Sequence, residues 1–576
     1  MYPLTLGPLL RYDTVEQGIY HAFALIVTEH AVGTARESLA PPSIVYATNG
    51  DASTALQAQG KTLYMYNDAE RGKSYVFWRF KIEVALADAA QTVTYAVDGI
   101  TQPNEFNVPA KTQNFRWACH SCNGFSSGVK TEEWGGADPL WRDVLTEHER
   151  DPFHVVMGGG DQIYNDPIVT IPELKEWNDK EDRVEAMKMP ATDEIRAGID
   201  RYLFRHYVEW FGSGAFSQAI ARIPMINMLD DHDLIDGFGT YPDRLMMSSI
   251  FNTIGSRGYF FYLLFQQFVC DAEDDITNSP ANAGPANPFR SLVIGGPGAY
   301  IPYPTHSILT YLGPNQYSLL LDCRAQRRLD QVVAQDTYDR CREAVLGLPD
   351  SVQHLMVQLG VPLAYPRMVV IEKLLSSKHN PFVFLAKKLL PKFTNNFNGQ
   401  VELLDDLNDH WCSVVHKHER NRLIENLHNM ALRKRIRISF ISGDVHAGGC
   451  SVFEDFRRVK PEQDHKYMVA MITSAIVNVP PPPPVITMVN TLARKKHTTL
   501  HHIRTREYML PLFDRDFHGK TQSNKYVVGA RNWCAVSYDK ESGDLVMQLR
   551  VEKEQGTGKV ATYDVHAPPP NFRKSL

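Results

Sequence analysis

The sequence lacks the features that would place the chain in a membrane, in a disulfide scaffold or on nucleic acid. None of its apolar runs reaches the roughly 18 to 20 residues needed to span a bilayer. Eight cysteines in 576 residues are too few for a disulfide framework, and a chain of this length buries large cores without one. The net charge of −6 gives no general reason to expect a nucleic-acid partner. We therefore expect reduced thiols, an intracellular, cytoplasmic location and no nucleic acid as a partner.

Two well-known signatures are present only in part. Cys119 and Cys122 have the C-x-x-C spacing of a zinc or redox site, but no second C-x-x-C completes four zinc ligands. Taken alone, this pair favours buried structural cysteines. The glycines at 158–160 resemble a phosphate-cradling loop, but the Lys-Ser/Thr pair of a P-loop does not follow them. These residues therefore need another explanation.

What the sequence does contain is two regions of different patterning. Residues 1–110 hold short β-branched and aromatic segments separated by turn residues, which predicts an N-terminal all-β sandwich of Ig/fibronectin-like type. In residues 111–576, short apolar strands alternate with longer charged, helix-like stretches, which predicts a single α/β domain. The strands expected there are Phe115–Cys119, Phe153–Met157, Met225–Leu229, Ser318–Leu321, His354–Leu359, Ile436–Ile441 and Tyr467–Ile472. The helical stretches expected are Pro172–Met187, Asp193–Tyr207 and Asn408–Leu427.

Four of these strands end in side chains that can carry chemistry, which is where α/β folds place their sites. After the apolar strand that ends at Leu229, four ionisable groups follow one another at 230–233, a costly arrangement unless a cation compensates it. Asp444 and His446 are two residues apart, so in extended backbone they point the same way. The first two strand ends present Cys122 and Asp161, the latter with Tyr164 one helical turn further on.

Together, four motifs resemble the PhoD-like (alkaline phosphatase D) family of metallophosphatases, most closely its fungal-type branch. They are Ser121-Cys-Asn123, Gly160-Asp-Gln-Ile-Tyr164, Asp230-Asp-His-Asp233 and Ser442-Gly-Asp-Val-His446. The order and spacing agree from about residue 1 to 550. The resemblance implies a calcineurin-like β-sandwich core flanked by helices, preceded by an N-terminal β-sandwich.

The resemblance also implies a site for two metal ions. Its ligands would be Cys122, Asp161, Tyr164, Asp231, Asp444 and His446. Asp161 would bridge the two ions, Cys122, Tyr164 and His446 would complete the first, and Asp231 and Asp444 would hold the second. Thiolate, phenolate, imidazole and carboxylate together suit iron, whereas carboxylates alone favour Ca²⁺, Mg²⁺ or Mn²⁺. The family resemblance gives Fe³⁺ with Ca²⁺.

The same resemblance implies roles at the substrate. His232 would lie beside the scissile phosphate, Arg324 would clamp phosphate oxygens, and Asn123 would contribute to substrate binding. Arg324 follows another apolar strand, and the arginine fork binds two oxygens at once. Two cations acidify a bridging water, and the resulting hydroxide would attack phosphorus, which makes Asp161, His232 and Arg324 the catalytic residues.

One departure from the broader calcineurin-like pattern concerns the second ion. Those enzymes supply another His to it, and Gly360 stands where that His is expected. A phosphate ester is the expected substrate, and monoesterase and diesterase activity both stay open. So does a non-catalytic phospho-ligand or protein-binding module on a phosphatase core. The basic stretch 494–506 is expected to be a solvated surface loop, and the proline run at 480–484 a rigid connector after a strand.

Overall fold

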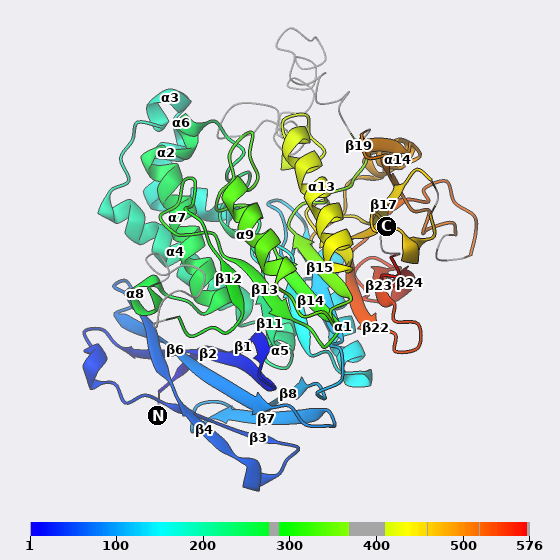
Figure 1. The fold of residues 1–576 in the computed structure, drawn as a ribbon. Coiled ribbons are helices and arrows are strands. Elements are labelled where there is room, and N and C mark those ends of the chain that lie inside the picture. The colour runs from blue at the N-terminus through cyan, green and yellow to red at the C-terminus, as the bar shows by residue number, and fades with distance from the viewer. Residues whose placement is uncertain are drawn as a thin grey trace.

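The computed structural model describes residues 2–275, 287–367 and 409–572, except residues 458, 501, 516 and 518, and these form three β-sheets flanked by helices (Figure 1). The first sheet has ten strands, in the order β24 (Val560–Ala567), β23 (Leu545–Glu552), β22 (Asn532–Tyr538), β9 (Trp117–His120), β10 (Val155–Gly158), β11 (Met225–Asn227), β1 (Leu4–Glu16), β2 (Ile19–Ala31), β6 (Lys73–Ala85) and β5 (Lys61–Asp68). Its centre, from β9 to β1, is parallel, and the strands on either side are antiparallel.

The second sheet also has ten strands. Along it lie β12 (Leu292–Ile294), β13 (Ser307–Tyr311), β14 (Gln316–Leu320), β15 (His354–Leu359), β16 (Arg437–Ser442), β18 (Met468–Ile472), β17 (Gly448–Asp455), β20 (Thr505–Met509) and β19 (His497–Leu500), while β21 (Val527–Val528) pairs with β17. From β14 to β18 the strands are parallel, and all of their residues but one are buried. Burial on both faces is typical of parallel strands in α/β layers.

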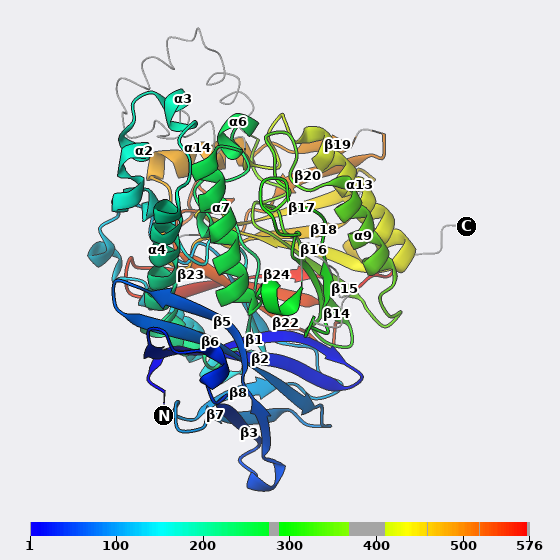
Figure 2. The ribbon, with the colours of Figure 1, turned by 90° about the vertical axis from the view of Figure 1, so that its left-hand side faces the viewer.

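The two large sheets share one hydrophobic core, to which Met157 contributes from the first sheet and Met356 and Met471 from the second. A separate core joins the second sheet to α9 (Gln335–Leu346) and α13 (Lys417–Lys434). Against the first sheet lie α1 (Asp138–Arg150), α4 (Asp193–Phe211), α5 (Gly214–Ile220) and α7 (Ser249–Tyr262). In Figure 2, α4 and α7 lie on the left and α9 and α13 on the right. The predicted mixed α/β layering is therefore confirmed, whereas the calcineurin-like core stays a prediction.

The N-terminal strands belong to two sheets. A four-stranded sheet contains β4 (Leu56–Gln59), β3 (Ser43–Thr48), β7 (Gln91–Val97) and β8 (Asn104–Val108), and it packs on β2 and β6. These last two strands, with β1 and β5, form part of the first ten-stranded sheet, because β1 pairs in parallel with β11 through Arg11 and Met225. Hydrogen bonds between strands therefore link residues before position 110 with residues after it. The domain division there and the Ig/fibronectin-like identity stay predictions.

The seven predicted strands correspond to β9, β10, β11, β14, β15, β16 and β18, with ends shifted by at most two residues. The stretch 172–187 is broken into short turns of helix, and residue 408 of the third predicted helix lies outside the described residues. Two surface predictions need correction. The basic stretch 494–506 contains β19 and the start of β20, and the proline run ends inside α14 (Pro483–Ala493), whose first turn tolerates proline because its N–H groups have no helical partner. No helix in the described residues is both long and apolar enough to cross a membrane.

Candidate metal centre

The parallel strands of both large sheets end at a common place, and the predicted ligands follow these ends. In the first sheet Gly158 is in register with His120 and with Asn227, so β9, β10 and β11 stop at the same level. The Gln358 Nε2 of β15 donates a 2.6 Å hydrogen bond to Gly158 O of β10, which brings the ends of the two sheets together. Loops that are distant in sequence thereby meet in one region.

The backbone is strained at four of the six predicted ligands. Cys122, Asp161, Asp444 and His446 have φ values of +53°, +56°, +69° and +48°, in the left-handed region that non-glycine residues rarely adopt. The Cys122 loop is held in place because its N–H donates to the carbonyl of Gly160 at 3.1 Å. Such strain costs on the order of 1–3 kcal/mol per residue and clusters at functional sites. The strained positions coincide with the strand ends singled out from the sequence.

The residues predicted for the first ion lie in pairs. Cys122 Sγ is 3.5 Å from Asp161 Oδ2, and Tyr164 OH is 3.1 Å from His446 Nε2. Cys122 and Tyr164 also belong to one small buried cluster, which links the two pairs. Burial lowers the pKa of His446 to about 4, so its imidazole is neutral, the form that binds metals. The structure therefore brings these four side chains together.

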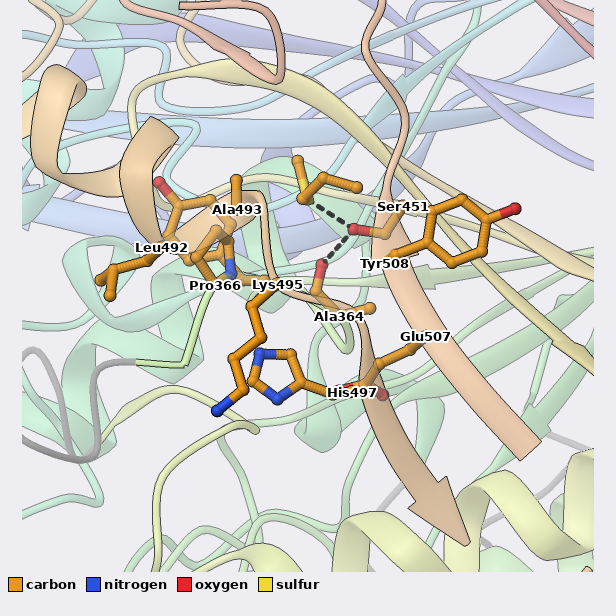
Figure 3. A pocket seen from close by; sticks show the side chains of 11 residues that line it. Ala364, Pro366, Ser451, Leu492, Ala493, Lys495, His497, Glu507 and Tyr508 are labelled. Carbon is orange, nitrogen blue, oxygen red and sulfur yellow. Dashed lines mark hydrogen bonds between the residues drawn. The ribbon is translucent and has the colours of Figure 1, made fainter. Parts of the chain in front are cut away.

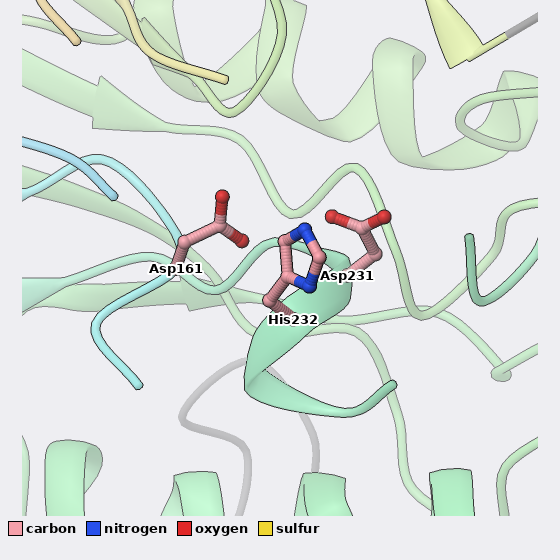
Figure 4. A group of neighbouring side chains, drawn as sticks. All are labelled: Asp161, Asp231 and His232. Atoms are coloured by element: carbon pink, nitrogen blue, oxygen red, sulfur yellow. The ribbon is translucent and has the colours of Figure 1, made fainter. Parts of the chain in front are cut away.

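A second group contains Asp161, Asp231 and His232, whose ligand atoms all lie within 4.8 Å of one another (Figure 4). Asp231 is fixed because its Oδ2 accepts a 2.7 Å hydrogen bond from Gly237 N. Asp444 is the other predicted ligand of the second ion. It is close enough to Asp231 for the charge of that carboxylate to raise the pKa of Asp444. The structure also places His410 Nε2 3.9 Å from Asp444 Oδ2, a neighbour that no sequence motif indicated.

The electrostatics of this cluster fit a bound cation. Burial, reinforced by neighbouring carboxylates, raises the pKa of Asp161 and of Asp444 well above the ordinary range. Burial also raises the pKa values of Cys122 and Tyr164. Within the described residues, the buried Asp161 Oδ1 accepts no hydrogen bond. A buried carboxylate without a partner is costly, and a metal ion at this position would remove that cost. The donor set therefore fits the two cations that the motifs implied.

His232 is oriented by a residue that the sequence analysis missed. Its Nδ1 lies 2.8 Å from Asp166 Oδ2, and the other Asp166 oxygen accepts a 2.9 Å bond from Asp236 N. The His232 ring stacks on Tyr164 at 4.3 Å. Burial favours the neutral imidazole, but the surrounding carboxylates outweigh it and raise the pKa of His232 well above its usual value. The available signal was a carboxylate two residues after Tyr164, in the loop that already carried a predicted ligand.

Asp233 is the second missed residue. It belongs to the motif at 230–233, but the sequence analysis assigned no role to it. In the structure its buried carboxylate accepts hydrogen bonds from the backbone N–H groups of Asp161, Gln162 and Asp230 at 2.8, 3.2 and 2.9 Å. It therefore ties the loop after β10 to the loop after β11. Sequence spacing cannot reveal this function, because it depends on which of four neighbouring side chains turns inward.

Of the three residues predicted at the substrate, Arg324 and Asn123 are fully buried and bonded to other residues. Arg324 is fully buried; it forms a bidentate pair with Asp409 at 2.5 and 2.9 Å, pairs with Asp230 and lies 3.5 Å from Asp231 Oδ1. Asn123 is equally buried. Its Oδ1 accepts a 2.7 Å bond from Trp141 Nε1, and its Nδ2 donates to Gln162 O at 3.2 Å. Their substrate-binding roles stay predictions.

The surroundings of Gly360 explain why a glycine, and not the expected histidine, occupies this position. A Cβ at this residue would lie 2.5 Å from Asp230 Oδ2, so the Asp230 carboxyl fills the space that a histidine would need. Arg324 holds that carboxyl in place. The glycine found in place of the expected histidine therefore lies against the buried ion pair of Asp230 and Arg324, beside the predicted second ion.

A separate pocket lies away from this cluster, on the second sheet (Figure 3). It lies beside β20 and the end of α14, and none of the predicted ligands lines it. In it Ser451 Oγ donates to Ala364 O at 2.9 Å, and Glu507 contributes a charged wall. Glu507 is already paired with arginines, so this pocket offers no free carboxylate comparable to Asp161.

Comparisons with known proteins agree with the geometry. The family model of the PhoD related phosphatases matches residues 84–382 and 383–565. The uncharacterised protein YGR266W of Saccharomyces cerevisiae is 35% identical over 517 residues, which are 82% of this chain and 72% of the yeast protein. A solved structure described as the structure of PhoD superposes with a TM-score of 0.54 at 11% identity, over 100% of this chain and 94% of that one, a likeness of fold. The chain belongs to the family of PhoD-related phosphatases.

Proposed function

We propose that the protein is a metal-dependent hydrolase of phosphoric esters, acting on monoesters, diesters or both. The observation that carries this proposal is the buried Asp161 carboxylate with an unpartnered oxygen, at the meeting point of a thiol, a phenol, an imidazole and a second carboxylate. Nothing structural is gained from collecting these groups in one place without a cation. Membership of the phosphatase family supplies the reaction class.

The chemistry of the ligands supports two different cations, one iron ion and one ion that prefers oxygen ligands. Cys122, Asp161, Tyr164 and His446 would hold Fe³⁺, and Asp161, Asp231 and Asp444 would hold Ca²⁺, with Mg²⁺ or Mn²⁺ as the alternatives. Two such cations would acidify a water molecule to serve as the nucleophile and would neutralise the charge of the phosphoryl oxygens. The side chains around the ions would orient the ester and protonate the leaving group.

His232 would handle the leaving group. Its Nδ1 is bound to Asp166 and its ring is stacked on Tyr164, so Nε2 is the atom that serves the substrate. Asp166 and the neighbouring carboxylates raise the pKa of His232 against the effect of burial, which favours the protonated imidazole, and Nε2–H would donate its proton to the departing alkoxide. Arg324 would act indirectly, by neutralising Asp230 and steadying Asp231.

Metal analysis combined with a substrate panel tests the proposal. The purified protein is expected to contain iron, to absorb visible light through the Tyr164 phenolate, and to hydrolyse p-nitrophenyl phosphate, its bis ester, or both. The ratio of the two rates decides between monoesterase and diesterase. A colourless, iron-free protein that is fully active would overturn the iron assignment. A metal-loaded protein that binds phosphate but turns over no ester would favour the non-catalytic module.

A further inference from the structure

The loop after β18 surrounds Cys122, although none of its residues belongs to the motifs that predicted the site. Ser121 Oγ donates to Thr473 O at 3.0 Å, Ile476 N donates to Ser121 O at 3.1 Å, and Asn478 N donates to Cys122 O at 3.2 Å. A fifth strand end therefore meets the four that carry the predicted ligands. Within this loop, one side-chain hydroxyl lies at hydrogen-bond distance from the Cys122 sulfur.

That side chain is Ser474, which is fully buried. Its Oγ accepts a 3.0 Å hydrogen bond from the backbone N–H of His446 and lies 3.0 Å from Cys122 Sγ. A serine hydroxyl has one hydrogen to donate. Since the N–H of His446 occupies a lone pair of Oγ, the hydroxyl hydrogen remains for the sulfur. The backbone of Ser474 is itself fixed, because its carbonyl accepts a 2.6 Å bond from Asn532 Nδ2.

A cation at Cys122 fixes the direction of this bond. The sulfur that binds a metal is the thiolate, which has no proton and can only accept a hydrogen bond. Ser121 Oγ is the other hydroxyl near the sulfur, but it is 3.5 Å away and its hydrogen is given to Thr473 O. Ser474 is therefore the hydroxyl whose hydrogen the geometry directs to the sulfur.

We infer that Ser474 is a positioning residue that donates a hydrogen bond to the Cys122 thiolate and, through its bond to His446 N, holds two ligands of one cation in register across the two sheets. This inference rests on the proposed function, because it requires a cation at Cys122. A hydrogen bond withdraws electron density from the sulfur, so it weakens the donation of charge to the metal. Ser474 thus tunes the cation as well as holding its ligands.

Cobalt(II) added to the metal-free protein is the probe, because a thiolate bound to cobalt gives a charge-transfer absorption band. The wild-type protein should show this band, and Cys122→Ser should lack it. Ser474→Ala should move the band to longer wavelength, since a sulfur without its hydrogen bond is a stronger donor of charge. It should also weaken cobalt binding roughly tenfold, because Cys122 and His446 are no longer held in register. Ser474→Thr keeps the hydroxyl and should restore the wild-type band.

Ser121→Ala is the matched control, because it removes the neighbouring hydroxyl that does not donate to the sulfur. Its band should stay at the wild-type wavelength. A Ser474→Ala band that coincides with the wild-type band overturns the inference while leaving the metal site intact. Absence of the band from the wild-type protein overturns the proposed cation at Cys122, and with it the inference. If Ser474→Ala does not fold, resonance Raman spectra of the wild-type cobalt protein decide: a sulfur that accepts an O–H hydrogen bond gives a cobalt–sulfur stretch that shifts on exchange into D₂O, and an unshifted stretch overturns the inference.

Discussion

Two of the buried acidic clusters in the described part of the chain differ in how their negative charge is balanced. At Glu507 the carboxylate accepts bonds from Arg420 at 2.5 Å, Arg367 at 2.6 Å and Thr499 at 2.6 Å. Burial alone would oppose its charge, but the two arginines outweigh burial and lower the pKa of Glu507 to about 2. At Asp161 burial and neighbouring acids raise the pKa instead, and one oxygen has no partner in the described part of the chain.

This difference separates a structural cluster from a functional one. The protein supplies its own cations to Glu507, so that cluster is complete as folded and needs nothing from solution. The strand-end cluster consists of Asp161, Asp231, His232 and Asp444. Besides His232, which is paired with Asp166, the described residues place one guanidinium beside it, that of Arg324, and this is shared by Asp230, Asp231 and Asp409. Uncompensated buried charge at the ends of parallel strands is where an external cation is expected.

Asp161→Asn should give the largest effect and tests the functional side of the comparison. It removes the carboxylate charge that would bridge two cations while keeping the size of the side chain. Turnover should fall by about 10³-fold or more, whereas the melting temperature of the metal-free protein should stay the same or rise, because a neutral amide replaces a buried carboxyl that has an unpartnered oxygen. Steady-state kinetics and thermal unfolding measure the two quantities. Turnover within a few fold of the wild type would remove the dinuclear site from the mechanism.

Arg324→Met comes next and tests the arginine of the strand-end cluster. The change leaves the Asp230 carboxylate buried without its guanidinium partner, whereas Asp409 keeps its ion pair with Arg327, so it should lower the free energy of unfolding by about 3 kcal/mol. Chemical denaturation measures this loss. A variant of normal stability with a raised KM for the ester would instead support a phosphate clamp. Arg328→Met, at a largely exposed arginine nearby in sequence, is the control and should change little.

The strands and ligands could be predicted because both leave local signals. β15 and β16 are short segments rich in apolar and β-branched residues, and Asp444 and His446 come shortly after the second of them. The partners of these ligands left no such signal. Ser474 is 352 residues from Cys122, and Asp409 is 85 residues from Arg324, so neither pairing produces a pattern along the chain. The substrate contact of Arg324 was inferred from the resemblance, from its position after a strand and from the chemistry of arginine, and none of these reports burial.

Glu507→Gln tests the structural side of the comparison and should have a smaller effect. The change leaves the guanidinium groups of Arg367 and Arg420 partly uncompensated, which should cost about 3 kcal/mol of unfolding free energy. Turnover of the folded protein should be unchanged, because Glu507 lines a different pocket. Denaturation and kinetics on the same preparation measure both. Loss of activity at wild-type stability would contradict the division between the two clusters.

The pH dependence of stability should have opposite signs in the two clusters. Glu507 has a folded pKa near 2 against an ordinary value of 4.5, so its contribution is present above pH 4.5 and is lost as the pH falls toward 2. Asp230 and Asp233 have folded pKa values of about 6 and about 7 against 3.8, so their contribution is present below pH 3.8 and is lost as the pH rises through 6 to 7.

Protein stripped of metal by a chelator should therefore become less stable between about pH 4 and pH 7, by at most about 1.4 kcal/mol per pH unit for each group. Adding the metals back should flatten or reverse this slope, because cations favour the ionised carboxylates. Urea unfolding of the two forms across this range measures the slopes, and Glu507→Gln should leave their difference unchanged. Identical slopes with and without metal would mean that the strand-end acids are balanced within the protein, as Glu507 is, and the contrast between the clusters would disappear.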